Sequence, residues 1–188
     1  SDHIVCLMRH FHTFSLMDVS EAARLIRFNR NSEEIQLWAD LGCGTGTFTY
    51  ALASHLPPQS TIYAVDQSEQ NLRSKVNGVE ICYVQMDFSK GIDSMPELHG
   101  VLMANSLHYI KDKSAFLEII RQKLTRNKRQ LLVVEYETEV GNNWVPYPVT
   151  FSQLKKLVIQ QGATKVEKID VRPSRYQGEM YAAIIEFN

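Results

Sequence analysis

The feature that most constrains the fold is the alternation of short, β-branched apolar runs with longer stretches of helical periodicity. Strands that are separated by helical segments pair in parallel through right-handed crossovers, so this order predicts a doubly wound, three-layer α/β sandwich. The apolar runs that are expected to form strands cover residues 35–40, 61–66, 81–85, 101–104, 131–135, 165–170 and 181–187. The segments that are expected to form helices cover residues 48–55, 69–75, 114–124 and 151–161.

Residues with particular backbone preferences mark several boundaries of these elements. Ser114 is expected to cap the third helix, because its side chain can accept hydrogen bonds from the amide groups that open a helix. Thr150 or Ser152 is expected to cap the last helix, and Gly162 to supply the left-handed residue at its C-terminal end. Two prolines place residues 144–148 on a loop, since proline is excluded from the interior of a helix or a central strand.

The length and the apolar content predict a single domain. The chain has 188 residues, and 44% of them are hydrophobic, which is ordinary for a protein with one core. We therefore expect one domain over residues 1–188, in which an α/β core over residues 34–188 follows a helical N-terminal segment over residues 1–33. Such a segment either packs beside the sheet or closes over a ligand as a lid, and periodicity does not decide between the two.

Cysteine usage and hydropathy indicate the compartment. Cys6, Cys43 and Cys82 are odd in number and widely spaced, which argues against a disulfide framework and a structural zinc site. No segment approaches the roughly 18 consecutive apolar residues that span a bilayer, and residues 1–9 lack the pattern of a signal peptide. We therefore expect a cytoplasmic protein without a membrane partner.

Charge and histidine content give no sign of nucleic acid or metal. The formal net charge is -1, which offers no overall attraction for phosphates, so a nucleic-acid partner is not expected. The basic run over residues 121–129 could touch RNA, but cations near the end of a helix also complement its dipole. His3, His10 and His12 lie near the start of the chain, where histidines are more often bystanders than ligands, so no metal is expected.

The most specific segment is Asp40-Leu41-Gly42-Cys43-Gly44-Thr45-Gly46, at the end of the first expected strand. Alternate glycines let the backbone turn sharply and leave no Cβ to block a ligand that lies against it. In a doubly wound sheet this position is the carboxyl end of a strand, where ligands bind. A tight turn without a ligand is the alternative, and the carboxylate of Asp40 beside a helix N-terminus argues against it.

The spacing of the glycines discriminates between cofactors. A dinucleotide-binding loop follows G-x-G-x-x-G, and a P-loop requires a lysine after its last glycine, whereas here the glycines alternate and no such lysine follows. A carboxylate at Asp40 would repel a pyrophosphate and attract an ammonium group. The pattern therefore favours the amino acid end of S-adenosylmethionine over a phosphate.

With these residues, the segment resembles the first motif of the class I S-adenosylmethionine-dependent methyltransferases, and the similarity continues in order along most of the chain. The resemblance implies a Rossmann-like, seven-stranded sheet that is mostly parallel and has an antiparallel last strand. It also implies that Gly42, Gly44 and Gly46, with Asp40 and Cys43 beside them, bind the methionine part of S-adenosylmethionine and of the product S-adenosylhomocysteine.

The ends of the second and third expected strands supply the adenosine side of the site. Asp66, followed by Gln67, lies about 20 residues beyond the glycine loop, the distance at which an acid meets ribose hydroxyls in a βαβ nucleotide site. Its alternative role is to cap the following segment. For Asp87 and Phe88 the resemblance implies contacts with the adenine ring, whereas taken alone they would be a turn residue and a core residue.

The fourth expected strand runs into Asn105-Ser106-Leu107-His108, which resembles the fourth-strand motif of the family. The resemblance implies that Asn105 and Ser106 lie beside the sulfonium group, where the acceptor also binds. His108 could act there as a general base, although a lone histidine in a mixed apolar segment is more often structural. Enzymes that methylate amino groups of bases or of glutamine usually carry N-P-P-Y or D-P-P-Y here, so this departure argues against base N-methylation.

The residues after the fourth and fifth expected strands are candidate walls of an acceptor pocket. Glu135, Trp144, Tyr147 and Arg175 combine aromatic surface with charged groups, as a small-molecule pocket does, although the aromatic residues could simply pack a loop onto the sheet. We therefore expect an enzyme that transfers a methyl group to a small-molecule acceptor by in-line displacement. The alternatives are a methyltransferase acting on RNA or protein, a cofactor-binding domain without transfer activity and, more distantly, a nucleotide-dependent oxidoreductase.

Overall fold

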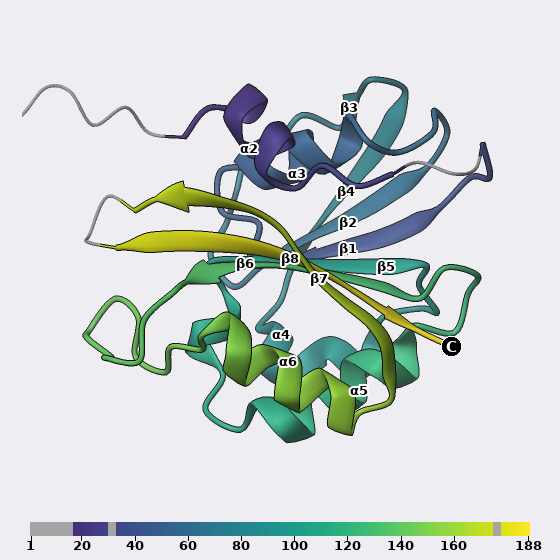
Figure 1. Cartoon of the computed structure of the whole chain (residues 1–188). Helices are drawn as coiled ribbons and strands as arrows, with labels where there is room; N and C mark the ends of the chain where they lie inside the picture. Colours follow the sequence, from purple (N-terminus) through teal and green to yellow (C-terminus); the bar gives the residue numbers. More distant parts are fainter. Residues whose placement is uncertain (1–16, 30–32, 175–177) are drawn as a thin grey trace, which may run out of the picture.

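The computed structural model describes residues 17–29, 33–174 and 178–188, and an eight-stranded mixed sheet lies at its centre (Figure 1). The strands are β1 (Leu37–Leu41), β2 (Thr61–Asp66), β3 (Lys75–Val76), β4 (Val79–Gln85), β5 (Gly100–Ala104), β6 (Gln130–Tyr136), β7 (Ala163–Pro173) and β8 (Glu179–Phe187). Their order is β3-β4-β2-β1-β5-β6-β8-β7. Neighbours from β4 to β6 run parallel, whereas β8 is antiparallel to β6 and β7. The predicted sheet with an antiparallel last strand is confirmed, and the short β3 is an additional strand.

Helices cover both faces of this sheet and complete the three layers visible in Figure 1. The helices on one face are α2 (Val19–Leu25) and α3 (Thr47–Ala53). The helices on the other face are α4 (Phe88–Gly91), α5 (Lys113–Lys123) and α6 (Phe151–Gln160). Two 3-10 turns follow α4 and β5, namely η2 (Ile92–Ser94) and η3 (Leu107–Tyr109).

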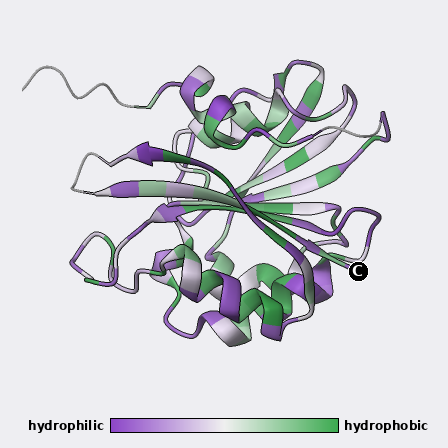
Figure 2. Ribbon diagram, in the orientation of Figure 1, coloured by the Kyte–Doolittle hydropathy of each residue, from purple (hydrophilic) through white to green (hydrophobic). Residues whose placement is uncertain are grey.

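The central strands are buried on both faces and feed two separate cores. Trp38 of β1 and Leu102 of β5 pack with α2 and α3, whereas Ala39 and Val101 pack with α5 and α6. Side chains alternate between the two faces of a strand, so a strand that is covered on both sides is apolar throughout. Figure 2 shows this apolar centre, and it explains why continuous apolar runs identified the strands.

The helix predicted over residues 69–75 is wrong. After β2 the chain continues as a loop and then enters a hairpin in which Val76 of β3 faces Val79 of β4. The turn consists of Asn77 and Gly78, whose φ angles are 52° and 79°. An Asn-Gly pair with two positive φ angles is the preferred two-residue hairpin turn, and this local signal outweighs a short, uncapped helical pattern.

The predicted helix ends are correct for α6 and wrong for α5. The N-cap of α5 is Asp112, whose carboxylate accepts a hydrogen bond from the Ala115 N–H at 3.0 Å, so Ser114 lies inside the helix. Of the two candidates for α6, the cap is Thr150, which accepts from the Gln153 N–H at 3.2 Å. Gly162 follows α6 with a φ of 87° and is the predicted left-handed residue.

The N-terminal segment is described only in part. Asp18 caps α2 through a capping box with Glu21, whereas residues 1–16 and 30–32, with Cys6 and the three terminal histidines, lie outside the described residues. Across the ranges that are described, no helix has the length and apolar character needed to cross a membrane.

Candidate functional site

The candidate site lies at the edge of the sheet where the parallel strands end. Strands β1, β2, β4, β5 and β6 all present their carboxyl ends there, as in other open α/β sheets that bind ligands. Two cavities of about 430 Å³ and 310 Å³ lie at this edge, and Gly42 and Asn105 line both. The two cavities therefore form neighbouring halves of one cleft over the glycine loop.

The glycine loop follows β1 and turns back on β2. The N–H groups of Gly42 and Cys43 both donate to the carbonyl oxygen of Val65, at 2.8 Å and 2.9 Å. Gly42 has a φ of 85°, and a Cβ placed on it would lie 2.7 Å from the Cβ of Ser106. A Cβ placed on Gly44 would meet no atom within 4 Å. The loop is thus packed tightly at Gly42 and open at Gly44.

The larger cavity brings together most of the residues that were predicted for the adenosine side. The predicted residues among its lining are Gly42, Asp66, Gln67, Asp87, Phe88, Asn105 and Ser106. Asp66 accepts hydrogen bonds from the N–H groups of Gly44 and Ser68, both at 2.9 Å. Each carboxylate oxygen can accept a second hydrogen bond, so Asp66 fixes the loop and still has acceptor capacity toward the cavity.

Asp87 lies at the mouth of the same cavity, as the N-cap of α4. It accepts hydrogen bonds from the Ser89 hydroxyl at 2.6 Å and the Ser89 N–H at 3.0 Å, and it pairs with Lys90 at 3.2 Å. These bonds, led by the one from the Ser89 hydroxyl, hold the pKa of Asp87 below its ordinary value. Asp87 is therefore an ionised acceptor at neutral pH.

The smaller cavity lies on the other side of Gly42 and includes the predicted residues Cys43 and Gly44. Burial raises the pKa of the Cys43 thiol, which therefore stays protonated. Sequence reasoning missed several residues of this wall, among them Met17 and Arg172. Arg172 contacts Glu21 of α2 at 3.2 Å, and no local pattern in β7 indicates that it reaches the glycine loop. Gly46 begins α3 as its N-cap and is not part of either wall.

Asp40 lies beneath the glycine loop, and only 1% of its surface is exposed. One carboxylate oxygen accepts the Thr49 hydroxyl at 2.6 Å, and the other, Oδ1, has no hydrogen-bond partner. Burial raises the pKa of Asp40 to about 7, an effect that the Thr49 hydrogen bond opposes and the charge of Asp66 reinforces. Asp40 lines neither half of the cleft, and its predicted contact with an ammonium group stays a prediction.

Asn105 occupies the junction of the whole site. It lines both halves of the cleft and also a third cavity of about 160 Å³. Its φ of 54° is unusual for a residue other than glycine, and its Oδ1 is buried without a hydrogen-bond partner. Strained backbone and orphaned polar atoms of this kind concentrate at functional sites.

The third cavity contains His108, which forms a buried pair with Glu135. The Nδ1 atom of His108 lies 2.8 Å from Oε2 of Glu135, and the His108 N–H donates to Oε1 at 3.0 Å. Both residues are almost fully enclosed, with 2% and 0% of their surfaces exposed. The pair joins η3 to the end of β6, two elements that the sequence separates by 27 positions.

The remaining predicted acceptor residues have different outcomes. Trp144 lines the third cavity with Tyr109 and Tyr136, which adjoin His108 and Glu135 in the sequence. Tyr147 does not line it. Its N–H donates to the His108 carbonyl at 3.0 Å, and its carbonyl accepts from Lys113 at 2.6 Å, so it anchors the loop. Arg175 lies outside the described residues.

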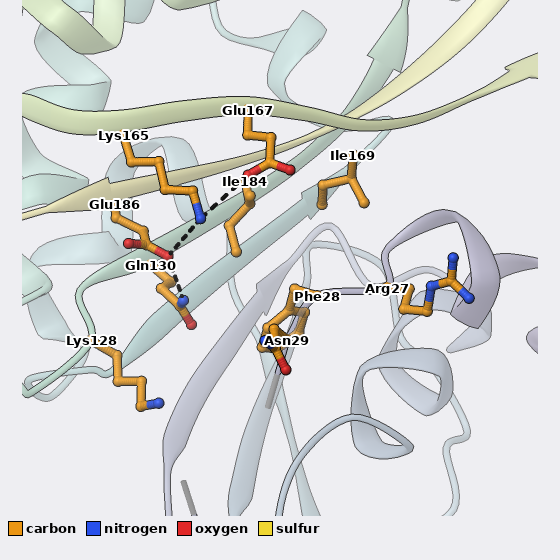
Figure 3. Close-up of a pocket in the computed structure, with 10 residues that line it drawn as sticks. All are labelled: Arg27, Phe28, Asn29, Lys128, Gln130, Lys165, Glu167, Ile169, Ile184 and Glu186. Atoms are coloured by element: carbon orange, nitrogen blue, oxygen red, sulfur yellow. Dashed lines mark hydrogen bonds and ion pairs between the residues drawn. The ribbon is translucent and has the colours of Figure 1, made fainter. Parts of the chain in front are cut away.

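A separate cavity of about 300 Å³ lies at the opposite edge of the sheet, near the start of β6 (Figure 3). In it Lys165 lies between Glu167 at 3.3 Å and Glu186 at 3.7 Å. None of the predicted site residues lines this cavity, so it is distinct from the cleft described above.

Part of the sequence of the α/β core is similar to a known family. Residues 39–127, which begin within β1 and include the glycine loop and the strands β2 to β5, match the family model of a methyltransferase domain. A comparison of the chain with curated proteins finds no match.

Solved structures share the fold at low sequence identity. Magnesium protoporphyrin IX methyltransferase from Synechocystis PCC 6803, solved with bound SAM, has a TM-score of 0.60 at 15% identity, over 83% of this chain and 72% of that one. Precorrin-6y C5,15-methyltransferase from Geobacter metallireducens has a TM-score of 0.58 at 13% identity, over 90% and 87%. A SAM-dependent methyltransferase from Aquifex aeolicus has a TM-score of 0.57 at 14% identity, over 92% and 100%.

Proposed function

We propose that the chain is a class I S-adenosylmethionine-dependent methyltransferase that methylates a small-molecule acceptor with His108 as general base. The match of residues 39–127 to the methyltransferase-domain model and the shared fold support the enzyme class and the cofactor. The observation that carries this proposal is the buried pair of His108 and Glu135. It lines a cavity that shares Asn105 with the cofactor cleft. Two structurally similar enzymes are named for small acceptors, magnesium protoporphyrin IX and precorrin-6y, which supports a small acceptor here.

The cleft suits both ends of S-adenosylmethionine. The open side of Gly44 leaves room for the methionine part, and the unpartnered oxygen of Asp40 beneath the loop offers a negative charge to its ammonium group. Asp66, beside Gln67, offers acceptor capacity to the ribose hydroxyls. Asp87 offers an ionised acceptor to the adenine amino group.

We assign the reacting centre to the junction at Asn105 and Ser106. When bound, S-adenosylmethionine supplies an electrophilic methyl group on a sulfonium, which becomes the thioether of S-adenosylhomocysteine after transfer. The Ser106 hydroxyl donates to the Leu41 carbonyl at 2.6 Å, which fixes the end of β5 against the glycine loop. Asn105 therefore has a fixed position at the point where cofactor and acceptor meet.

The chemistry that this chain adds is the handling of a proton. Glu135 engages Nδ1 of His108, so the neutral imidazole carries its hydrogen there and leaves Nε2 as the acceptor. Nε2 takes the proton from the nucleophile of the acceptor, and the carboxylate of Glu135 stabilises the imidazolium that forms. The buried position of the pair keeps water away from this proton transfer.

We further propose that one cofactor-binding domain contains the whole site and works in the reducing cytoplasm. The contact of Met17 with the cleft supports the first point, because it brings the N-terminal segment to the glycine loop. The free thiols of Cys43 and Cys82 support the second.

The experiment that tests the proposal uses S-adenosylmethionine with a labelled methyl group. The protein is incubated with a cell extract that has been separated into small molecules, RNA and protein, and the label is followed into each fraction. We expect label in the small-molecule fraction, and a loss of at least 100-fold in rate for His108→Asn. Label only in RNA or protein would contradict the proposal.

Calorimetry provides the control for that experiment. His108→Asn is expected to bind S-adenosylhomocysteine within twofold of the parent protein, because His108 does not line the cleft halves that flank Gly42. Asp66→Ala is expected to weaken the same binding at least tenfold. Equal weakening by both substitutions would place His108 in the cofactor site and remove its role as base.

A further inference from the structure

The cavity beside His108 has the size of a single ring. Its volume is about 160 Å³, close to that of the roughly 150 Å³ engineered cavity that accommodates benzene in another protein. It meets the cofactor cleft at Asn105 and Tyr136. A compound with one six-membered ring can therefore fill it while its substituent reaches the junction.

The walls of this cavity are aromatic, and two of them face solvent. Tyr109 and Trp144 are 56% and 76% exposed, which makes them two of the few large apolar side chains at the described surface. The rings of Tyr109 and Tyr136 flank the His108 imidazole, with centroids 4.4 Å and 6.0 Å away from it. Exposed aromatic surface grouped around a cavity indicates a ligand that covers it, and a flat ring suits such walls best.

The described walls of the cavity have no cationic side chain to balance a negatively charged ligand. Among the described residues that line it, none is Asp, Glu, Lys or Arg. Nε2 of His108 is an acceptor when Glu135 holds the hydrogen on Nδ1, and Oδ1 of Asn105 is an acceptor that has no partner. An entering carboxylate would find no cation to pair with and would face the charge of Glu135 behind His108, whereas a hydroxyl can donate to Nε2 of His108 or to Oδ1 of Asn105.

On the basis of the proposed function, we propose that the methyl acceptor is an uncharged, single-ring phenol. Its ring lies between Tyr109, Tyr136 and Trp144, and its hydroxyl donates to Nε2 of His108. The phenolic proton moves to Nε2, an electron pair of the phenolic oxygen forms the new bond to the methyl carbon, and the bond from that carbon to sulfur breaks with its pair left on sulfur. A phenol needs the base because its hydroxyl stays protonated at neutral pH, whereas a neutral aromatic amine can attack without one.

Ring binding can be measured apart from turnover through Trp144. The chain has two tryptophans, and Trp38 is fully buried, so a change in fluorescence on ligand addition reports on Trp144, with Trp144→Phe as the background. The probes are catechol, phenol and benzoate, each titrated with S-adenosylhomocysteine present. We expect catechol and phenol to bind at least tenfold more tightly than benzoate. Calorimetry, which does not need the indole as a reporter, should show that Trp144→Ala weakens both phenols about tenfold.

Turnover completes the test. Catechol is expected to accept a methyl group from S-adenosylmethionine, and His108→Asn to keep the binding of phenols within threefold while it loses at least 100-fold in rate. Tighter binding of benzoate, or no binding of any ring while S-adenosylhomocysteine binds, would overturn the phenol as acceptor. If the small-molecule fraction still receives label in that case, the proposed function stands without the phenol. Label confined to RNA or protein would instead mean that the proposed function itself fails.

Discussion

Two buried carboxylates, Asp40 at the end of β1 and Glu135 near the end of β6, serve the two halves of the site in different ways. Neither is more than 1% exposed. Asp40 receives one hydrogen bond, from Thr49, and its other oxygen has no partner. Both oxygens of Glu135 are bonded to His108.

In the cofactor half, one carboxylate oxygen lacks a hydrogen-bond partner within the protein. In the acceptor half, both carboxylate oxygens have partners within the protein. The bare oxygen of Asp40 is costly while it is charged and unpaired, so under the proposed function we expect the cofactor half to gain stability when the ammonium group binds near it. Neither oxygen of Glu135 lacks a hydrogen-bond partner, and its charge lies next to the imidazole of His108. The proposed function therefore predicts that the cofactor half gains stability from binding, whereas the hydrogen bonds of the acceptor half are complete before a ligand binds.

The largest effect is expected for Glu135→Gln, which removes the charge and keeps the shape. Glutamine cannot stabilise the imidazolium and does not hold the hydrogen on Nδ1, so kcat should fall by about 1,000-fold or more, or about 4 kcal/mol. The KM for the acceptor should stay within about twofold. Steady-state kinetics on the acceptor found by labelling provides the measurement.

A matched variant isolates this effect from the general loss of a carboxylate. Glu186→Gln on β8 also changes a carboxylate that bonds a neighbouring amide, that of Gln130, but it lies at the opposite edge of the sheet. Its kcat should be unchanged. If Glu135→Gln and Glu186→Gln behave alike, Glu135 is structural and the comparison between the two halves does not hold.

A nearly equal effect, in stability, is expected for Asp40→Asn. The pKa of Asp40 is about 7 in the folded protein, raised by burial from 3.8, so the folded state binds more protons than the unfolded state between those values. Stability should therefore fall as the pH rises from about 4 to about 7, by up to about 4 kcal/mol. Asp40→Asn should remove this fall, as measured by denaturant unfolding across that range.

Asp87 provides a control of opposite sign. Its pKa is lowered in the folded protein by the Ser89 hydroxyl, so its contribution is present above its unfolded pKa and lost as the pH falls through the folded value. Asp87→Asn should leave the decline in stability above pH 4 intact.

Binding of S-adenosylmethionine near pH 7 should also release protons from Asp40, which calorimetry in two buffers of different ionisation enthalpy detects. A pH-independent Asp40→Asn difference would contradict a titrating Asp40.

Gly42→Ala should have the next largest effect. The new Cβ would lie 2.7 Å from the Cβ of Ser106, at a φ of 85°, so the glycine loop and the end of β5 must separate. We expect binding of S-adenosylhomocysteine to weaken about 100-fold, or about 3 kcal/mol. Gly162→Ala is the matched control, because Gly162 has a φ of 87° and no atom within 4 Å of the added Cβ. Gly162→Ala should cost about 1 kcal/mol of stability and leave the binding of S-adenosylhomocysteine unchanged. If both substitutions weaken binding equally, backbone strain alone explains the Gly42→Ala result.

The sequence indicated the cofactor half well because that half is encoded locally. Gly42 and Gly44 lie within one short segment, and Asp66 and Asp87 end strands that apolar runs identify. Parallel pairing brings such strand ends to one edge, so topology alone brings these residues together. The burial of Asp40 beneath the loop could not be predicted in this way, because it depends on how Thr49 of α3 packs against the carboxylate.

The acceptor half was harder to predict because its contacts join distant segments. His108 and Glu135 were both named as candidates, but their pairing across 27 positions depends on the register of β5 and β6. Arg172 enters the cleft from β7 through its contact with Glu21, 151 positions away. The wrong helix over residues 69–75 has a different cause, since the Asn77-Gly78 turn was a local signal that outweighed periodicity.

The smallest effect is expected for Thr150→Ala, which tests whether the loop before α6 holds the acceptor wall in place. Thr150 accepts from the Gln153 N–H at 3.2 Å, and the Gln153 side chain accepts from the Thr150 N–H at 3.0 Å. Loss of this capping box should cost about 1 kcal/mol of stability, seen in thermal unfolding. It should raise the acceptor KM slightly, because the same loop carries Trp144, and it should leave cofactor binding unchanged. Ser152→Ala, two residues into the same loop-to-helix segment, should change neither quantity. A Thr150→Ala protein whose cofactor binding weakens as much as its acceptor KM rises would mean that the two halves are not independent.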